Sequence, residues 1–347
     1  MKKFSVILIA SVLVLSGCSS SKKETLRILS PTVYIDKSVI TDFEKEHNVK
    51  VIYDTFDSNE AMYTKILSGD KYDILIPSDY MIERLIEEDK LEKLDRSKLK
   101  NIGGLNPELL GKSFDPSDEY SVPYFWGSIG IVYNQTVIDK TLVETQGWSI
   151  LRNTDYKGRL YFYDSERDAF MIALKALGYS ANTTSVAELE AAQQWLLDQK
   201  AEMNPIYVTD EVIDYMLDGT RDLAILYSGD AAYVMSENED MAYFEPLEGT
   251  NVWVDSLVIT KDVTNIDLAL AWIDFMLDPK VAEKNAVEVG YTPVILSVYQ
   301  ALSGPGGDFE GISAFTPRSG YSKDEIFRHN EAMRVKIAEL WNIVIAK

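Results

Sequence analysis

The spacing of apolar residues along the chain alternates between the two-residue period of strands and the longer period of amphipathic helices. Strands and helices are predicted in turn over the first part of the chain, at residues 26–29, 37–45, 49–53, 59–68, 72–76 and 81–88. Strands that alternate with helices in this way pair into a mainly parallel sheet, with a ligand crevice at the carboxyl ends of the strands. The loops at those ends are residues 30–34, 55–59 and 77–80.

Two later segments have the pattern of strands that cross between lobes. Residues 120–134 form an extended apolar stretch broken by glycine, and residues 251–259 form a second one. The other elements predicted are strands at 159–163 and 222–227, and helices at 168–177, 186–198, 266–277, 280–287 and 324–344. The predicted fold class is therefore α/β, with two lobes, crossing hinge strands and a cleft between the lobes.

The first residues have the pattern of a secretory signal. Met1-Lys2-Lys3 is positively charged, residues 4–15 are almost wholly apolar, and Leu15-Ser16-Gly17-Cys18 closes the segment with small residues. Such a stretch is too short to span a membrane. It resembles the lipobox of bacterial lipoproteins, which implies cleavage before Cys18 and lipidation of its thiol. We expect residues 1–17 to be the signal peptide and residues 18–24 a lipidated tether; the alternative is a signal cleaved elsewhere.

Composition narrows the classes of partner. The 347 residues include 34 Lys and Arg against 55 Asp and Glu, a net charge of −21. Such an acidic surface repels phosphate backbones, so no nucleic acid partner is expected. One cysteine and two histidines give no disulfide, no expected metal site and no zinc enzyme signature. No nucleophile elbow, metalloprotease motif or phosphate loop occurs, so we expect neither an enzyme nor a cofactor.

Aromatic residues recur beside carboxylates where strands are predicted to end. These segments are residues 77–80, 163–168, 227–230, 253–255 and 290–293. Trp253 and Asp255 alternate, so on a strand they share one face. An aromatic plane attracts an ammonium group by ~0.5–2 kcal/mol, and a nearby carboxylate adds Coulombic attraction. The pattern therefore favours an organic cation as the ligand.

Six stretches spread over the chain carry a family resemblance. They are VIYDTFDSNEAMYTKI (51–66), YDILIPSDY (72–80), SFDPSDEYSVPYFWGSIGIVYN (113–134), LGYSANTT (177–184), WVDSLVI (253–259) and VGYTP (289–293). With them the chain resembles the bacterial spermidine/putrescine-binding proteins, the substrate-capture subunits of polyamine ABC importers. The resemblance implies a two-lobed periplasmic-binding-protein-like fold that closes on its ligand by a hinge. It also implies a permease and an ATPase as partners.

The resemblance implies a set of ligand-binding residues. Asp255 and Asp168 are expected to hold ammonium groups, with Asp230 and Asp79 as weaker candidates. Trp253, Tyr80, Tyr227 and Tyr291 are expected to line the aliphatic part of the ligand. The remaining predicted binding residues are Thr32, Tyr34, Ser78 and Asp164.

The chain departs from the family pattern at a few positions. The first pocket loop departs at Ser30-Pro31, where Pro31 replaces an aromatic residue of the family. Asp164-Ser165 stands where many relatives have two acids or an acid and a glycine. Tyr227 takes a position often filled by Trp, and Arg328 falls near a pocket glutamine of some relatives. If Arg328 faced the cleft it would repel a polyamine, so the same fold binding another cationic or polar solute stays open as an alternative. A sensory or adhesive lipoprotein is the second alternative.

The predicted organisation follows from these assignments. One lobe is expected to comprise residues 25–126 and 252–300, and the other residues 127–251 and 301–347. The protein is expected to be a monomer held at the outer face of the cell membrane by the lipid on Cys18.

Overall fold

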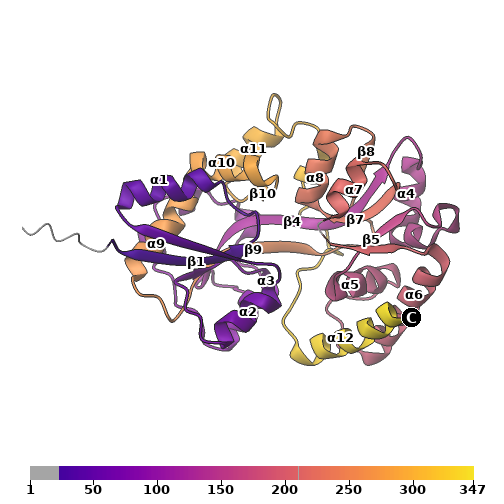
Figure 1. Ribbon diagram of the computed structural model, residues 1–347, viewed down its shortest axis with the longest axis horizontal. Helices are drawn as coiled ribbons and strands as arrows, with labels where there is room; N and C mark the ends of the chain where they lie inside the picture. The colour runs from indigo at the N-terminus through magenta and orange to yellow at the C-terminus, as the bar shows by residue number, and fades with distance from the viewer. Residues whose placement is uncertain (1–22, 210) are drawn as a thin grey trace, which may run out of the picture.

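One strand, β4 (Ser121–Asn134), runs through both halves of the molecule and joins them (Figure 1). The computed structural model describes residues 23–209 and 211–347. The first part of β4 pairs antiparallel with β9 (Val252–Ile259). Its second part pairs antiparallel with β7 (Leu223–Tyr227) and β8 (Met241–Phe244). Both strands predicted at these positions are present, as β4 and β9, and β4 pairs with strands of both halves.

The first lobe has a parallel sheet with helices on its faces (Figure 1). Strand β1 (Thr25–Pro31) lies between β2 (Lys50–Phe56) and β3 (Ile74–Leu75), parallel to both. The helices that follow these strands are α1 (Lys37–His47), α2 (Asn59–Leu67) and α3 (Asp79–Glu87). After β9 come α9 (Ile266–Met276), α10 (Pro279–Val289), β10 (Thr292–Pro293) and α11 (Leu296–Ser303).

The second lobe repeats the arrangement. Strand β5 (Leu160–Tyr163) pairs parallel with both β6 (Ile206–Val208) and β7. Its helices are α4 (Lys140–Gln146), α5 (Glu166–Ala176), α6 (Val186–Met203), α7 (Val212–Leu217), α8 (Ser228–Glu237) and α12 (Glu331–Ala346).

Short 3-10 turns occur in several connections along the chain, at Arg96–Lys98, Ile102–Gly104, Pro107–Leu109, Gly147–Arg152, Thr154–Tyr156 and Ser313–Phe315.

The strand order β2-β1-β3-β9-β4-β7-β5-β6 makes one sheet that continues from lobe to lobe, with β8 and β10 paired to β4 beside it. This confirms the predicted α/β class. The residue boundaries proposed for the two lobes remain a prediction.

Local capping explains where several helices begin. The side chains of Asp36, Ser58 and Ser165 accept main-chain N–H bonds at the starts of α1, α2 and α5. The helix predicted at 324–344 begins instead at Glu331, because Asn330 caps it by accepting from the N–H of Met333. Residues 324–330, here called the C-terminal strap, are extended rather than helical.

Helix α8 corrects a second expectation. No helix was predicted directly after the strand at 222–227, yet Ser228 opens this helix. Its first turn holds a glycine, and the small residues Ala231 and Ala232 are buried, so the segment lacks an amphipathic pattern.

Each lobe contains large buried aromatic side chains. In the first lobe Trp272 packs edge-on against Phe43, with ring centroids 4.9 Å apart. In the second, Trp148 is fully buried and donates from Nε1 to the carbonyl of Gly249 at 2.8 Å.

Within residues 23–209 and 211–347, no helix has the length and apolar character needed to cross a bilayer. The same residues contain no His, Cys, Asp and Glu group suited to a metal ion.

Candidate functional site

Three tyrosine–aspartate pairs mark the region where the two lobes meet. The Tyr34 hydroxyl donates to Asp255 Oδ2 at 2.5 Å, and the Tyr227 hydroxyl donates to Asp168 Oδ2 at 2.7 Å. The Tyr291 hydroxyl donates to Asp230 Oδ1 at 3.1 Å. All six side chains belong to the predicted set, and the chain brings them together from segments far apart in sequence.

Asp255 is the most sharply defined of these acids. Its residue is only 8% exposed, and burial raises the pKa of its carboxyl to about 6, with the hydrogen bond from Tyr34 opposing the shift. Among the described residues no hydrogen-bond partner reaches its second oxygen, Oδ1, which is also buried. A buried carboxylate oxygen without a partner is costly, and an ammonium group would satisfy it.

The other two acids lie in the first turns of helices. Asp168 is the third residue of α5 and Asp230 the third of α8, and both helices follow strands of the second lobe. Burial raises the pKa of Asp168, while the Tyr227 hydroxyl opposes the shift. The positive end of a helix dipole stabilises a carboxylate placed there. These acids are therefore held at strand ends, where the sheet topology predicts the crevice.

Aromatic rings connect the pairs into one wall. Trp253 lies 5.4 Å from Tyr291 and 6.4 Å from Tyr227, measured between ring centroids. Tyr291 in turn lies 5.6 Å from Tyr34, edge to face. The wall thus runs from Asp255 past Trp253 to Asp168, with an anion near each end, and the carboxylate of Asp230 lies beside Tyr291 between them.

Two glycines make room for the wall. A β-carbon at Gly229 would overlap the ring of Tyr291, and one at Gly127 would overlap Trp253. Gly127 lies opposite Trp253 in the β4–β9 pairing, so the indole lies against strand backbone. Only the absence of side chains at these positions lets both rings approach so closely.

Ser78 and Asp79 attach the start of α3 to β9. Ser78 forms an antiparallel bridge with Asp255 and accepts a hydrogen bond at Oγ from Asn59 Nδ2. Asp79 is fully buried, and its two oxygens accept from the N–H groups of Tyr80 and Val254. Burial raises the pKa of Asp79 to about 8. These contacts give Asp79 a role in positioning the strand that carries Asp255.

Tyr80, a predicted binding residue, contacts three residues that the sequence analysis did not single out. Its hydroxyl donates to Glu60 Oε1 at 3.2 Å, and its ring lies 6.5 Å from that of Phe327. The guanidinium of Arg167 stacks over the Tyr80 ring at 3.8 Å. No sequence signal links these residues, because they come from separate elements of both lobes.

Two predicted residues lie apart from the wall. Thr32 is exposed and donates to the carbonyl of Phe56 and to Asp57. Asp164 is exposed at the end of β5, and its main-chain N–H bonds to Val208. A ligand role for either stays a prediction. The loop expected at residues 30–34 begins only after Pro31, because Ser30 and Pro31 still pair with β2 as the last residues of β1. Beside Thr32, Val33 is 75% exposed with φ of 52°, so the apolar side chain of Val33 projects into solvent.

Arg328 is engaged by a carboxylate of the first lobe. Its Nε donates to both oxygens of Glu83, at 2.8 and 3.0 Å, and the main-chain N–H of His329 donates to Glu83 Oε2. Glu83 lies on α3, so this pair joins the C-terminal strap to the first lobe. The repulsion considered for Arg328 is therefore compensated by Glu83.

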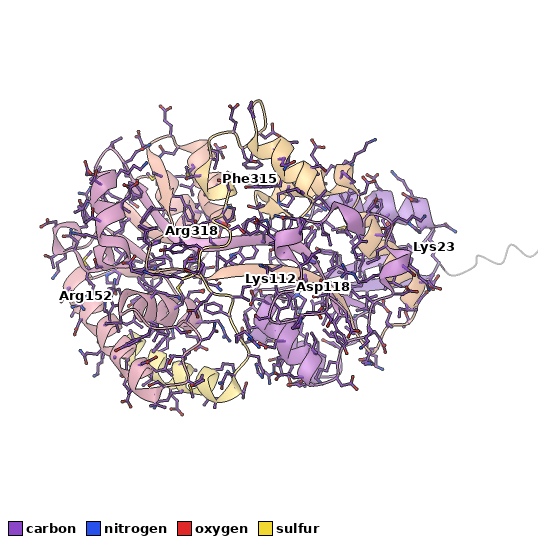
Figure 2. The ribbon with its side chains drawn as sticks, turned by 180° about the vertical axis from the view of Figure 1, so that it is seen from behind. Lys23, Lys112, Asp118, Arg152, Phe315 and Arg318 are labelled. Atoms are coloured by element: carbon purple, nitrogen blue, oxygen red, sulfur yellow. The ribbon has the colours of Figure 1, made fainter. Side chains whose placement is uncertain are left out.

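The opposite face of β9 borders a separate cavity. A cavity of about 320 Å³ is lined by Val252 and Val254, which alternate with Trp253 and Asp255 along the strand. Figure 2, drawn from behind, labels Lys112 and Arg318, which also line this cavity. None of the twelve predicted binding residues lines it.

The arrangement suits binding of a dication. Two anionic ends separated by an apolar aromatic wall match a solute with ammonium groups at both ends of an alkyl chain.

Comparison with known proteins points the same way. A profile described as "Bacterial extracellular solute-binding protein" matches residues 38–307. The spermidine/putrescine-binding periplasmic protein of Salmonella typhimurium is 35% identical over 308 residues, covering 87% of this chain and 88% of that protein. The corresponding protein of Escherichia coli is also 35% identical, over 311 residues with the same coverage.

Among solved structures, a putative spermidine/putrescine ABC transporter protein from Listeria monocytogenes superposes with a TM-score of 0.83 at 38% identity. It covers 93% of this chain and 99% of its own. The spermidine/putrescine transporter substrate-binding protein of Streptococcus pneumoniae gives a TM-score of 0.80 at 36% identity with the same coverage.

Proposed function

The chain belongs to the bacterial extracellular solute-binding proteins, and from that membership we propose that it captures a polyamine between its lobes and delivers it to an ABC permease. The family binds solutes rather than transforming them, which confirms the expectation that the protein is not an enzyme. The polyamine is spermidine or putrescine, the solutes named for the similar proteins.

One observation carries the proposal: Asp255 is buried against aromatic rings with an unpartnered carboxylate oxygen. A ligand ammonium placed there would neutralise the buried charge and supply the missing hydrogen bond. Asp168 lies near the other end of the aromatic wall and would take a second ammonium. The alkyl chain between them would cover the faces of Trp253 and Tyr291.

A different cationic solute is the alternative that one feature favours. Pro31 ends β1 directly before the first loop, at a position where the family resemblance implies an aromatic ring, and Val33 projects into solvent nearby. The loop therefore offers a ligand less ring surface than the family pattern would. A solute held only by the acids and the central wall would suit such a loop.

Titration calorimetry with putrescine, spermidine and spermine tests the proposal. We expect saturable binding of at least one of them, and mass spectrometry of ligand released from the purified protein should detect the same compound. Butane-1,4-diol is the matched control, since it keeps the chain of putrescine but lacks both charges, and it should not bind. If the protein binds none of the three polyamines at millimolar concentration, polyamine capture is excluded.

We also propose that a lipid on Cys18 anchors the protein at the outer face of the cell membrane. Cys18 lies outside the described residues. Cys18→Ala should abolish incorporation of labelled fatty acid and move the protein from the membrane fraction to the medium. The reason is that acyl chains, rather than a spanning helix, hold a lipoprotein. Undiminished labelling of the variant would disprove the lipidation site. We expect the anchored protein to act as a monomer with permease and ATPase subunits.

A further inference from the structure

The guanidinium of Arg167 crosses from the second lobe to the first. Arg167 is the second residue of α5, and it reaches over α3 and α2. Its Cζ lies 3.8 Å from the centroid of the Tyr80 ring and 5.4 Å from that of Phe327. One of its terminal nitrogens lies 3.8 Å from Glu60 Oε1. The Tyr80 hydroxyl donates to the same carboxylate.

This group has the chemistry of an ammonium site. Two aromatic rings and a carboxylate surround one cation, as the wall and its acids would surround a ligand ammonium. The difference is that the cation belongs to the protein. We call Tyr80, Phe327 and Glu60, with Arg167 between them, the occupied box.

The occupied box lies next to one proposed end of the ligand. Arg167 directly precedes Asp168, and its charge favours the ionised forms of both Asp168 and Asp79, lowering their pKa values against the effect of burial. Its side chain is 21% exposed, so its charge is only partly screened by water. A ligand ammonium that extended past Asp168 toward the box would meet a fixed positive charge.

We propose that Arg167 closes this end of the cleft to ligand ammonium groups and so discriminates against the longest polyamines. The inference rests on the proposed polyamine function. Putrescine has ammonium groups only at its two ends, and these are matched by Asp255 and Asp168. Spermine carries further ammonium groups on a longer chain, and one of them would have to displace Arg167 from two rings and a carboxylate.

The test compares affinities for putrescine, spermidine and spermine by calorimetry in Arg167→Ala and Arg167→Met. Both substitutions remove the charge, and methionine keeps most of the volume in case alanine disturbs folding. We expect the ratio of spermine affinity to putrescine affinity to rise about tenfold, the size of one strong cation–aromatic contact. Arg167→Lys keeps a cation in the occupied box and should keep the native ratio.

Arg328→Gln is the matched control, because it also removes an arginine that joins the lobes but acts on Glu83, outside the occupied box. It should change the three affinities by one common factor. If Arg167→Ala and Arg167→Met also weaken all three ligands equally, Arg167 only holds the lobes together and the inference is wrong. A native protein that binds no polyamine overturns the proposed function itself, a result that the native titrations show before any variant is made.

Discussion

Asp255→Asn is expected to weaken polyamine binding at least ~30-fold. Removing one member of a desolvated, hydrogen-bonded charge pair costs ~2–5 kcal/mol, and each 1.4 kcal/mol is about tenfold in affinity. Asparagine keeps the shape and can still accept from Tyr34, so the loss reports the missing charge at Oδ1. Calorimetry on the native protein and the variant measures it directly.

The matched control is Asp89→Asn, which makes the same chemical change on a side chain that is 89% exposed and forms an ion pair with Lys261. It should leave the affinity within twofold of native, since an exposed ion pair contributes little. A loss of less than threefold in Asp255→Asn would mean that this carboxylate does not meet a ligand ammonium.

The affinity of the native protein for a polyamine should also fall as the pH falls, because protonation removes the negative charge of Asp255. The pKa of Asp255 is about 6 in the free protein, and an ammonium ligand binds the ionised form and lowers that pKa. Binding is therefore strongest above pH 6, and from pH 7.5 to pH 5 proton competition at this one carboxyl should reduce the affinity about tenfold. Asp255→Asn should lose this part of the fall and keep the parts that Asp168 and Asp79 contribute. Equal pH profiles for the two proteins would contradict the assignment.

Gly229→Ala should damage the binding site while leaving all its charges in place. Its β-carbon would overlap the ring of Tyr291, so the ring must leave its place against Trp253 and Asp230. Overpacking of this kind costs ~1–3 kcal/mol in stability. Losing the ring from the wall should weaken polyamine binding about tenfold.

Gly103→Ala provides the comparison, because within residues 23–209 and 211–347 no atom beyond its two chain neighbours lies within 4 Å of the β-carbon it would add. It should keep the native melting temperature and affinity. Native-like binding by Gly229→Ala would show that Tyr291 is not part of the ligand wall.

The Trp253–Asp255 part of the site could be predicted from the sequence because both residues lie on one short strand. Trp253 and Asp255 alternate on one strand, and the period of two already places them on one face. The structure adds that the residues between and before them, Val254 and Val252, face a different cavity. Strand β9 was predicted within one residue of its bounds, since both its faces are buried and its sequence is almost continuously apolar.

The occupied box could not be predicted in the same way. Arg167, Tyr80 and Phe327 are far apart in the sequence, and each has an ordinary local setting. Their contact exists only because the second lobe presents α5 to α3 of the first lobe. The same holds for Arg328, whose partner Glu83 lies on α3 and gives no signal in the residues around it.

The path of β9 also bears on when the chain can fold. Strand β3 has β1 on one side and β9 on the other, and β9 is reached only after the strands β5 to β8 of the second lobe. The first lobe therefore cannot complete its sheet from the N-terminal part of the chain alone. Pairings between such distant segments form slowly, because a long loop must close before they contribute any stability. For a chain proposed to leave the cytoplasm before it functions, late completion of the first lobe lengthens the period in which the polypeptide is still unfolded and able to pass through an export channel.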